Sequence, residues 1–322
     1  MIEAPPQDPL ATAVAAWRAR HPRLPLPGSG DTLGRWRVLA DIAREDVCVA
    51  KVLEAHYDAL AILSELGADD LAGDALHAVW AAEPPDARVG FRADRDTGSG
   101  TLSGTKAWCS GADLVDVALV TAHVDDARVL VRVPMDAPGV THDDSVWQAV
   151  GMARVRSGRV TLEGIRARQV GAPGAYLERP GFWHGGAGIA ACWFGAACAI
   201  ADVLRTDARA AHSPHAQVHL GVIDLALSAT ASLLRETAAA IDGAPDLPHV
   251  HAVMRVRSVA ERAATAVIDR VGRALGPGPL CGDRAHAQRC ADLSVFIRQS
   301  HAEHDWAALG AAVQQQENPW AL

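Results

Sequence analysis

The sequence predicts an α+β protein in three parts: N-terminal helices, a middle antiparallel β-barrel and a C-terminal four-helix bundle. Apolar residues recur at helical steps of three and four up to about residue 78. They then form short alternating runs between frequent turns up to about residue 172. Helical spacing returns after that point. We therefore predict domains at residues 1–78, 79–172 and 173–322.

The first region is predicted to hold one short and one long helix. The short helix, Leu10–Arg20, lies between proline-rich stretches. The long helix is capped by Asp31 or Thr32, whose side chains can accept hydrogen bonds from the first free N–H groups, and it runs to Leu66. A short helical piece, Asp69–Ala78, is expected to lead into the next region.

The middle region is predicted to consist of short strands joined by turns. A tight turn at Ser103-Gly104 separates two of them, because Ser and Gly favour turns. The predicted strands are Val89–Ala93, Thr101–Leu102, Lys106–Cys109, Val117–Ala122, Val129–Val133, Gly158–Leu162 and Ala167–Gln169. Many short strands at this spacing indicate an antiparallel sheet or a barrel.

The C-terminal region is predicted to fold as four antiparallel helices. Each helical segment is about 25 residues long, and Gly or Pro marks the short connections. The segments are about Gly186–Ala211, Pro214–Asp242, Pro248–Leu275 and Arg284–Leu309.

Composition narrows the partners and the compartment that we expect. A net charge of −8 with no basic run argues against a nucleic-acid partner, which needs clustered Lys and Arg. The apolar stretches, such as Gly188–Val203, are expected to be too short and too weak to span a membrane. The six cysteines form no CxxC pair and the N-terminus shows no secretory pattern, so we expect a reducing, cytoplasmic location.

One stretch of the middle region, Thr101–Ala122, carries a combined motif. It contains Gly104-x-Lys106-x-Trp108, a hydroxyl at Ser110, a Gly-Ala turn, an Asp and an apolar strand. This stretch resembles the middle-domain signature of the acyl-CoA dehydrogenase family, in which the aromatic residue and the hydroxyl residue two positions later lie against a flavin. The predicted order of helices, β-domain and four-helix bundle is also that family's order, with an N-terminal region truncated to about half its usual extent.

Three further segments resemble this family in their order and spacing. Glu83-Pro84 stands about 25 residues before Trp108, as a Thr-Glu-Pro motif does in the family, with Ala82 at the Thr position. Residues 147–153 resemble the family's Gly-Met-Arg segment, and residues 272–278 resemble its Gly-Gly-x-Gly turn.

The resemblance implies an FAD cofactor between the β-domain and the bundle. An indole can pack on a flavin ring, and a nearby hydroxyl or N–H group can hydrogen-bond to it. Trp80 is either a second wall of this site or a core residue. Arg273 and Gly276 are either pyrophosphate contacts or a surface side chain and a helix end. The predicted cofactor-binding residues are Trp108, Ser110, Ala82, Trp80, Arg273 and Gly276.

The position of the family's catalytic base holds no carboxylate. Matching Asp292 to the family's Asp places Ser300-His301-Ala302 where a Glu is expected. His301 can act as a base near neutral pH, and Glu303 is the second candidate. On one continuous helix His301, His304 and Asp305 would share a face. The alternative is a solvated helix end whose imidazoles complement the helix dipole.

A second histidine cluster carries His215 and His219 one helical turn apart. Two imidazoles at this spacing can bind zinc when a third ligand joins them. A surface helix start at Pro214 is the favoured interpretation, and no metal is predicted.

Together the motifs predict an FAD-dependent oxidoreductase that oxidises an acyl thioester or a related small substrate with an atypical base. Two alternatives stay open. One is a flavin-dependent monooxygenase of the same fold, with His301 near the flavin, and the other is a non-catalytic member that kept the scaffold. The resemblance also implies a homodimer or homotetramer, and it leaves an electron-transfer partner open.

Overall fold

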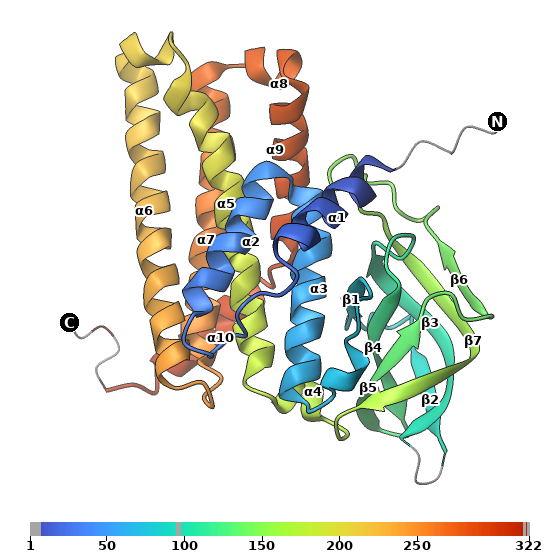
Figure 1. Cartoon of the computed structure of the whole chain (residues 1–322). Helices are drawn as coiled ribbons and strands as arrows, with labels where there is room; N and C mark the ends of the chain where they lie inside the picture. The colour runs from blue at the N-terminus through green and yellow to red at the C-terminus, as the bar shows by residue number, and fades with distance from the viewer. Residues whose placement is uncertain (1–7, 95–97, 318–319, 321–322) are drawn as a thin grey trace, which may run out of the picture. The chain divides into compact units, whose positions relative to one another are not determined.

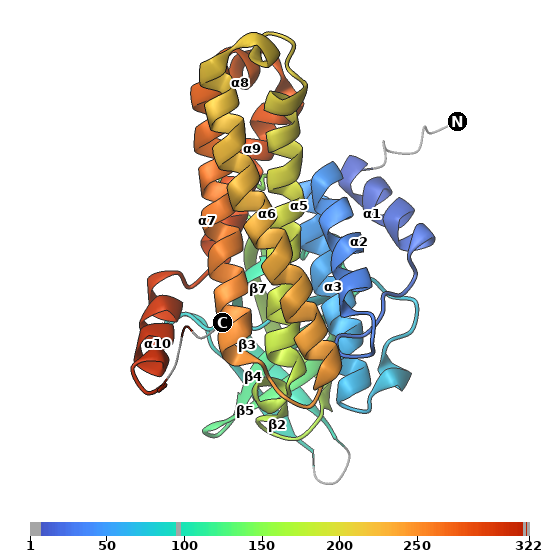
Figure 2. The ribbon, with the colours of Figure 1, turned by 90° about the vertical axis from the view of Figure 1, so that its left-hand side faces the viewer.

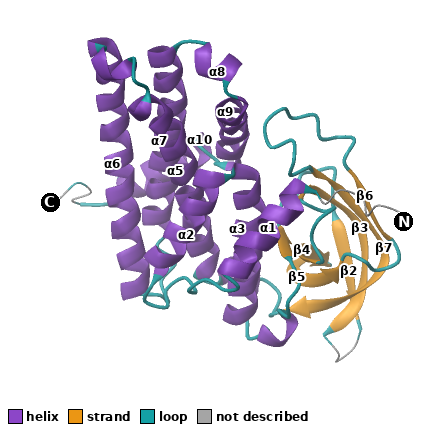
Figure 3. Cartoon of the chain, turned by 45° about the horizontal axis from the view of Figure 1, so that its top comes forward, coloured by secondary structure: helices purple, strands orange, loops and turns teal. Residues whose placement is uncertain are grey.

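The computed structural model describes residues 8–94, 98–317 and 320 (Figure 1). The chain divides into two compact units. Unit 1 comprises Met1–Leu24 and Cys48–Phe182, and unit 2 comprises Pro25–Val47 and Trp183–Leu322. The strands belong to unit 1, and unit 2 is helical (Figure 3). The three domain ranges stay predictions, and residues 1–7 of the first range lie outside the described residues.

The predicted long N-terminal helix is wrong, because it is two helices. Helix α2 (Thr32–Glu45) starts at Asp31, whose side chain accepts from the Gly34 N–H as predicted. It ends at Asp46, which adopts an extended conformation with φ −152° and ψ 118°. Helix α3 (Val47–Glu65) follows. Neither Gly nor Pro marks this break, so the apolar periodicity runs through it without a stop signal.

Of the two other segments predicted in the N-terminal region, the first is a helix as expected and the second is not. Helix α1 (Pro9–Arg20) agrees with its predicted range. The helical piece predicted at residues 69–78 is a 3₁₀ turn, Asp69–Leu71, followed by strand β1 (His77–Trp80). Strand β1 runs parallel to β4, with Trp80 opposite Val120, so a pairing distant in sequence decides its conformation.

The strands of unit 1 form a closed β-barrel. Around the barrel, β4 pairs with β2, β2 with β3, β3 with β7 and β7 with β5. Strand β5 pairs with β4 and so closes the barrel. All pairings are antiparallel except those of β4 with β1 and β2. The remaining strands are β2 (Val89–Ala93), β3 (Ser99–Ser110), β4 (Val117–Val124), β5 (Ala127–Pro134), β6 (Val140–Asp143) and β7 (Ser157–Val170). Strand β6 was not predicted.

The predicted turn at Ser103-Gly104 is wrong, because β3 continues through it. Gly104 has φ +130°, and a Cβ there would lie 2.9 Å from the Cα of Val89 and closer still to the Arg88 carbonyl. The glycine therefore permits close approach of β2 rather than a reversal of the chain. The predicted strands at residues 158–162 and 167–169 are likewise one strand, β7.

The core of unit 1 forms where α3 packs against the barrel. The side of α3 that carries Ile62 and Leu63 is fully buried against strand residues Leu119 and Leu130. Tyr176 of α4 (Ala175–Glu178) closes the same cluster. This packing covers the barrel where β4 and β5 lie.

Unit 2 is a bundle of long helices joined by α2 (Figures 1 and 2). Gly195 of α5 lets α2 approach closely, because a Cβ there would lie 2.7 Å from the Cα of Ala40. The helices that follow α2 are α5 (Gly181–Thr206, in this unit from Trp183), α6 (Pro214–Gly243), α7 (Val250–Leu275), α8 (Gly278–Gly282), α9 (Arg284–Phe296) and α10 (Glu303–Val313).

The fourth predicted bundle helix, residues 284–309, is wrong as a single helix. Helix α9 ends at Phe296, and a 3₁₀ turn leads to Ser300, which is extended with ψ 141°. Ala302 then has φ +38°, a conformation that a continuing helix excludes. Helix α10 is therefore a separate short helix at the side of the bundle (Figure 2).

Two helices are long and apolar enough to cross a membrane by length and composition. The expectation that the apolar stretches are too short is therefore wrong by that criterion. The apolar window of α5 is 72% buried inside the chain, as for a core helix, and that of α6 is 17% buried.

Candidate functional site

The most exposed large aromatic side chain of the barrel is Trp108, at the end of β3. Its side chain is 58% exposed, whereas Ala107 and Cys109 on either side are buried. The β3–β7 register shifts between Lys106 and Cys109, and Trp108 has φ +59°. Such a positive φ is an outlier for a bulky residue. The bulge interrupts the predicted alternation and turns the indole outward.

The loop that follows β6 supports this indole from one side. The rings of Trp108 and Trp147 meet edge-to-face, with centroids 6.4 Å apart and planes at 81°. The Trp147 Nε1–H donates to the Met152 carbonyl at 3.3 Å, which holds the second indole in place. Aromatic pairs of this geometry are favourable, so the Trp108 ring is oriented although it is exposed.

Ser110 lies two residues further along β3 and is half-buried. Its Oγ is 2.8 Å from the Ser157 Oγ of β7, with either atom able to donate. Its carbonyl accepts from the Trp80 Nε1–H at 3.3 Å. We call Trp108, Ser110 and the exposed Ala82 after β1 the Trp108 surface.

Trp80 belongs to the core rather than to a ligand surface. The side chain is 3% exposed and its only polar atom bonds to Ser110. Of the two interpretations left open by the sequence, the core residue is the one observed. Its role is to tie β1 to β3, so that Ala82 follows a strand that is fixed beside Ser110.

A partly buried charged network around Lys106 anchors the segment after β1. The Lys106 Nζ donates to the Thr121 Oγ1 at 2.7 Å and the Thr121 carbonyl at 2.9 Å, and it lies 3.6 Å from the Glu83 Oε1. The Thr121 hydroxyl donates to the Glu83 Oε1 at 2.7 Å. His123 and Arg128 approach the Glu83 Oε2 at 3.2 and 2.7 Å.

Burial and charge act in opposite directions in this network. Burial lowers the pKa of Lys106 to about 8, although the Glu83 charge opposes the change. Burial alone would raise the pKa of Glu83, but the Thr121 hydrogen bond and the charges of Lys106 and Arg128 together hold it below its ordinary value. Lys106 is 1% exposed, so its ammonium holds Glu83 and the segment after β1 in position rather than meeting a ligand.

Sequence reasoning noticed Lys106 and Glu83 as motif residues and gave them no role. The signal that could have found the pair is a lysine between buried strand residues, since a buried ammonium needs a carboxylate or several acceptors. The partners Thr121, His123 and Arg128 come from other strands, and no spacing in the sequence identifies them.

The predicted phosphate contacts form an ordinary helix end. The Arg273 Nε donates to both carboxylate oxygens of Asp269 at 2.8 Å, and its side chain is 65% exposed. Gly276 is the C-cap of α7 with φ +66°, which favours glycine. The structure thus explains both residues locally, and their role toward a pyrophosphate stays a prediction.

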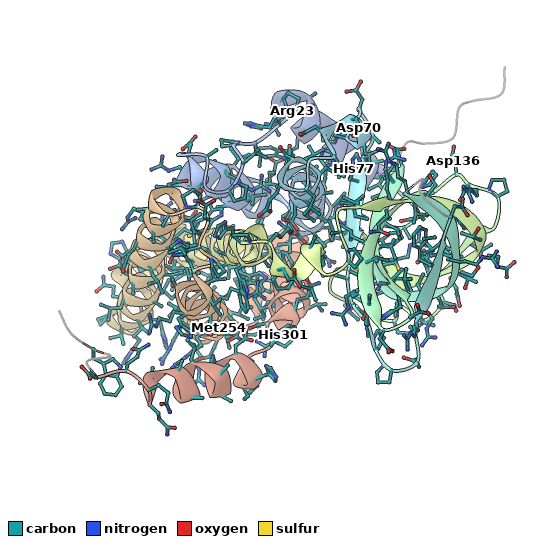
Figure 4. The ribbon with its side chains drawn as sticks, turned by 90° about the horizontal axis from the view of Figure 1, so that it is seen from below. Arg23, Asp70, His77, Asp136, Met254 and His301 are labelled. Carbon is teal, nitrogen blue, oxygen red and sulfur yellow. The ribbon has the colours of Figure 1, made fainter. Side chains whose placement is uncertain are left out.

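The candidate bases lie at the start of α10. His301 precedes the helix, so only His304 and Asp305 of the predicted shared face are helical. The His301 side chain is 77% exposed, with its Nδ1 3.8 Å from the Asp305 Oδ1 (Figure 4). Glu303 is exposed in the first turn of α10. Their catalytic roles stay predictions.

Among the described residues, no group of three His, Cys, Asp or Glu side chains is arranged to hold a metal ion. His215 and His219 lie in the first turns of α6, where Ser213 caps the helix through the Ala216 N–H.

Comparisons with known proteins identify the fold. No family model and no curated protein sequence matches the chain. The structure resembles glutaryl-CoA dehydrogenase from Mycobacterium smegmatis, with a TM-score of 0.80 and 17% identity over 96% of this chain and 87% of that one.

Two flavin complexes are also similar. The complex of TdsC, a dibenzothiophene monooxygenase from Paenibacillus sp. A11-2, with FMN and indole gives a TM-score of 0.75 and 19% identity over 87% of this chain and 82% of that one. KijD3 in complex with FMN and a dTDP-linked amino sugar gives a TM-score of 0.74 and 18% identity over 96% of this chain and 94% of that one. The chain therefore has the acyl-CoA dehydrogenase fold, which confirms the predicted fold class.

Proposed function

We propose that this chain is a flavin-dependent oxidoreductase whose flavin ring binds at the Trp108 surface. The observation that carries the proposal is the exposed Trp108 indole, held by a bulge at positive φ two residues before Ser110. A strained backbone of this kind costs about 1–3 kcal/mol and is concentrated at functional sites. The similar structures named above include a dehydrogenase and a monooxygenase, which supports oxidoreduction.

The residues of the Trp108 surface fit a flavin. The indole offers an apolar face of the size that a fused ring can cover, and its edge-to-face contact with Trp147 orients it. A hydroxyl has one donor and two acceptor positions. When the Ser157 hydroxyl donates to Ser110, Ser110 can donate to a ring nitrogen or oxygen; when Ser157 donates instead to the Val155 carbonyl at 3.3 Å, Ser110 donates to Ser157 and can accept from a ring N–H. When bound, the flavin would supply the acceptor for a hydride or for single electrons.

FAD is the flavin that the sequence resemblance implies, and FMN is the alternative that the TdsC and KijD3 complexes suggest. FAD needs a site for its second phosphate and adenosine, for which Arg273 and Gly276 are the proposed contacts. Extraction of the bound flavin followed by chromatography distinguishes the two molecules.

Oxidation of an acyl thioester or a related small substrate is the favoured reaction. It requires a base for the substrate proton, and His301 or Glu303 is proposed for that role. A flavin monooxygenase is the second candidate, supported by the similarity to TdsC. We also propose a cytoplasmic location and assembly as a homodimer or homotetramer. For the dehydrogenase reaction, the proposed electron acceptor is a partner protein.

The first experiment is an absorbance spectrum of the purified protein, with and without added flavin. Absorbance near the flavin bands supports the cofactor, whereas a colourless protein that takes up neither FAD nor FMN refutes it and leaves the scaffold role. Anaerobic mixing with glutaryl-CoA or butyryl-CoA should bleach the flavin of a dehydrogenase. Absence of bleaching, together with substrate-dependent oxygen consumption when reduced flavin is supplied, instead identifies the monooxygenase. Unchanged turnover of His301→Ala would remove His301 as the base.

A further inference from the structure

We propose that unit 1 carries a second ligand site that binds a small organic anion, separate from the Trp108 surface. A cavity of about 300 Å³ lies among the end of α1, the middle of α3 and the loop before β1. This volume lies at the lower end of the range for small-molecule sites. The lining residues that matter are Arg18, Pro22, Arg23, His56, Leu60 and Asp74.

The rim of this cavity is held in place by hydrogen bonds between its three segments. The Arg18 guanidinium donates to the Asp74 carbonyl at 2.6 Å, which connects α1 to the loop before β1. The Tyr57 hydroxyl of α3 donates to the His21 carbonyl at 2.6 Å, which connects the chain after α1 to α3. A site formed in advance loses less ordering entropy when a ligand binds.

A buried histidine forms the floor. His56 is 2% exposed, and its Nδ1 accepts the backbone N–H of His77 at 3.2 Å. In the neutral ring the proton is therefore on Nε2, which makes that atom a donor. The His77 ring stacks on His56 at 5.8 Å, and burial lowers the pKa of His77, so this support is uncharged.

The charge and polarity of the lining select the ligand. The lining contains two guanidinium groups, Arg18 and Arg23, and one carboxylate, Asp74, so its charge favours an anion. Leu60 and Pro22 offer apolar contacts to the rest of the molecule. The expected ligand carries one carboxylate or phosphate on a small apolar body.

The cavity and the Trp108 surface lie at opposite ends of β1. His77, behind the floor of the cavity, is its first residue, and Trp80, bonded to Ser110, is its last. Figure 4 labels Arg23 and His77 in this part of the unit. The proposed flavin contacts use none of the cavity residues, so occupation of the two sites can be measured separately.

The test is calorimetric titration of the purified protein with phenyl phosphate, benzoate and inorganic phosphate at constant ionic strength. We expect phenyl phosphate or benzoate to bind more tightly than inorganic phosphate, and the tighter of the two identifies the head group. Neutral phenol should not bind. Three outcomes would overturn the proposal. Neither aromatic anion binds, or phenol binds as tightly as they do, or inorganic phosphate binds as tightly as both.

Charge-neutral variants locate the site. Arg18→Gln and Arg23→Gln should each raise the Kd of the tighter-binding aromatic anion roughly tenfold or more, because each removes a charge-assisted hydrogen bond to the ligand. Arg20→Gln is the matched control, since Arg20 lies over the Trp17 ring, 3.8 Å from its centroid, on the same helix. Equal weakening by all three variants would show a non-specific charge effect and refute the site. An unchanged circular dichroism spectrum confirms folding in each case.

Discussion

Replacing Lys106 by Met should remove a pH dependence of stability that the buried network creates. The folded-state pKa of Lys106 is lowered by burial from 10.5 to about 8. Between these values the unfolded chain holds the proton and the folded chain releases it, so the unfolded state binds more protons and stability rises with pH. At about 1.4 kcal/mol for each pH unit, the wild-type protein should gain about 3 kcal/mol over Lys106→Met from pH 8 to 10.5.

The assay is urea unfolding followed by tryptophan fluorescence at several pH values in this window. Burial also raises the pKa of Cys109 to about 12 and raises that of Tyr176. Both groups lower stability at alkaline pH, but they are present in both proteins and largely cancel in the difference. The chain has one other lysine, Lys51, paired with Glu54, and Lys51→Met is the comparison for a lost lysine. A wild-type advantage that stays constant from pH 8 to 10.5 would refute the reasoning.

The remaining predictions concern unit 2 and are measured by chemical unfolding. Gly195→Ala should destabilise the protein by about 1–3 kcal/mol or more, because the new methyl group meets the α2 backbone at Ala40. Gly221→Ala, in open space on α6, should stabilise it by up to about 1 kcal/mol, and equal effects of the two changes would contradict the close approach of α2 and α5. Asp242→Ala should cost roughly 2–4 kcal/mol, because its carboxylate accepts from Gly30 N–H at 3.1 Å and from the buried Thr32 N–H and Oγ1 at 3.0 and 2.6 Å. The exposed Asp246→Ala is its control and should change stability by less than about 0.5 kcal/mol.

Local periodicity was sufficient to predict most helices and strands, because burial on one face imposes it. It failed where a single residue changes the backbone direction without Gly or Pro. Asp46 and Ala302 break helices whose apolar pattern continues, and neither residue type is a helix-stop signal. At Gly104 the error is the reverse: the glycine predicted a turn, but in the structure it permits the close approach of two strands.

The candidate site was predictable in part for a similar reason. The spacing of Trp108 and Ser110 was visible in the motif, and the fold confirmed by the comparisons agrees with it. The bulge that exposes Trp108 arises from the β3–β7 register, which no local pattern encodes. The hydrogen-bonded set of Lys106, Glu83 and Thr121 likewise needs three separate segments to meet.

The most direct test of the central claim is flavin affinity measured by quenching of flavin fluorescence. Trp108→Ala should raise the Kd for the bound flavin roughly tenfold or more, because the ring loses its aromatic support. Trp108→Phe should retain part of the affinity. Trp320→Ala, which removes a tryptophan that is 83% exposed, should leave the affinity unchanged. A Trp108→Ala protein that binds flavin as tightly as the wild type would contradict the account.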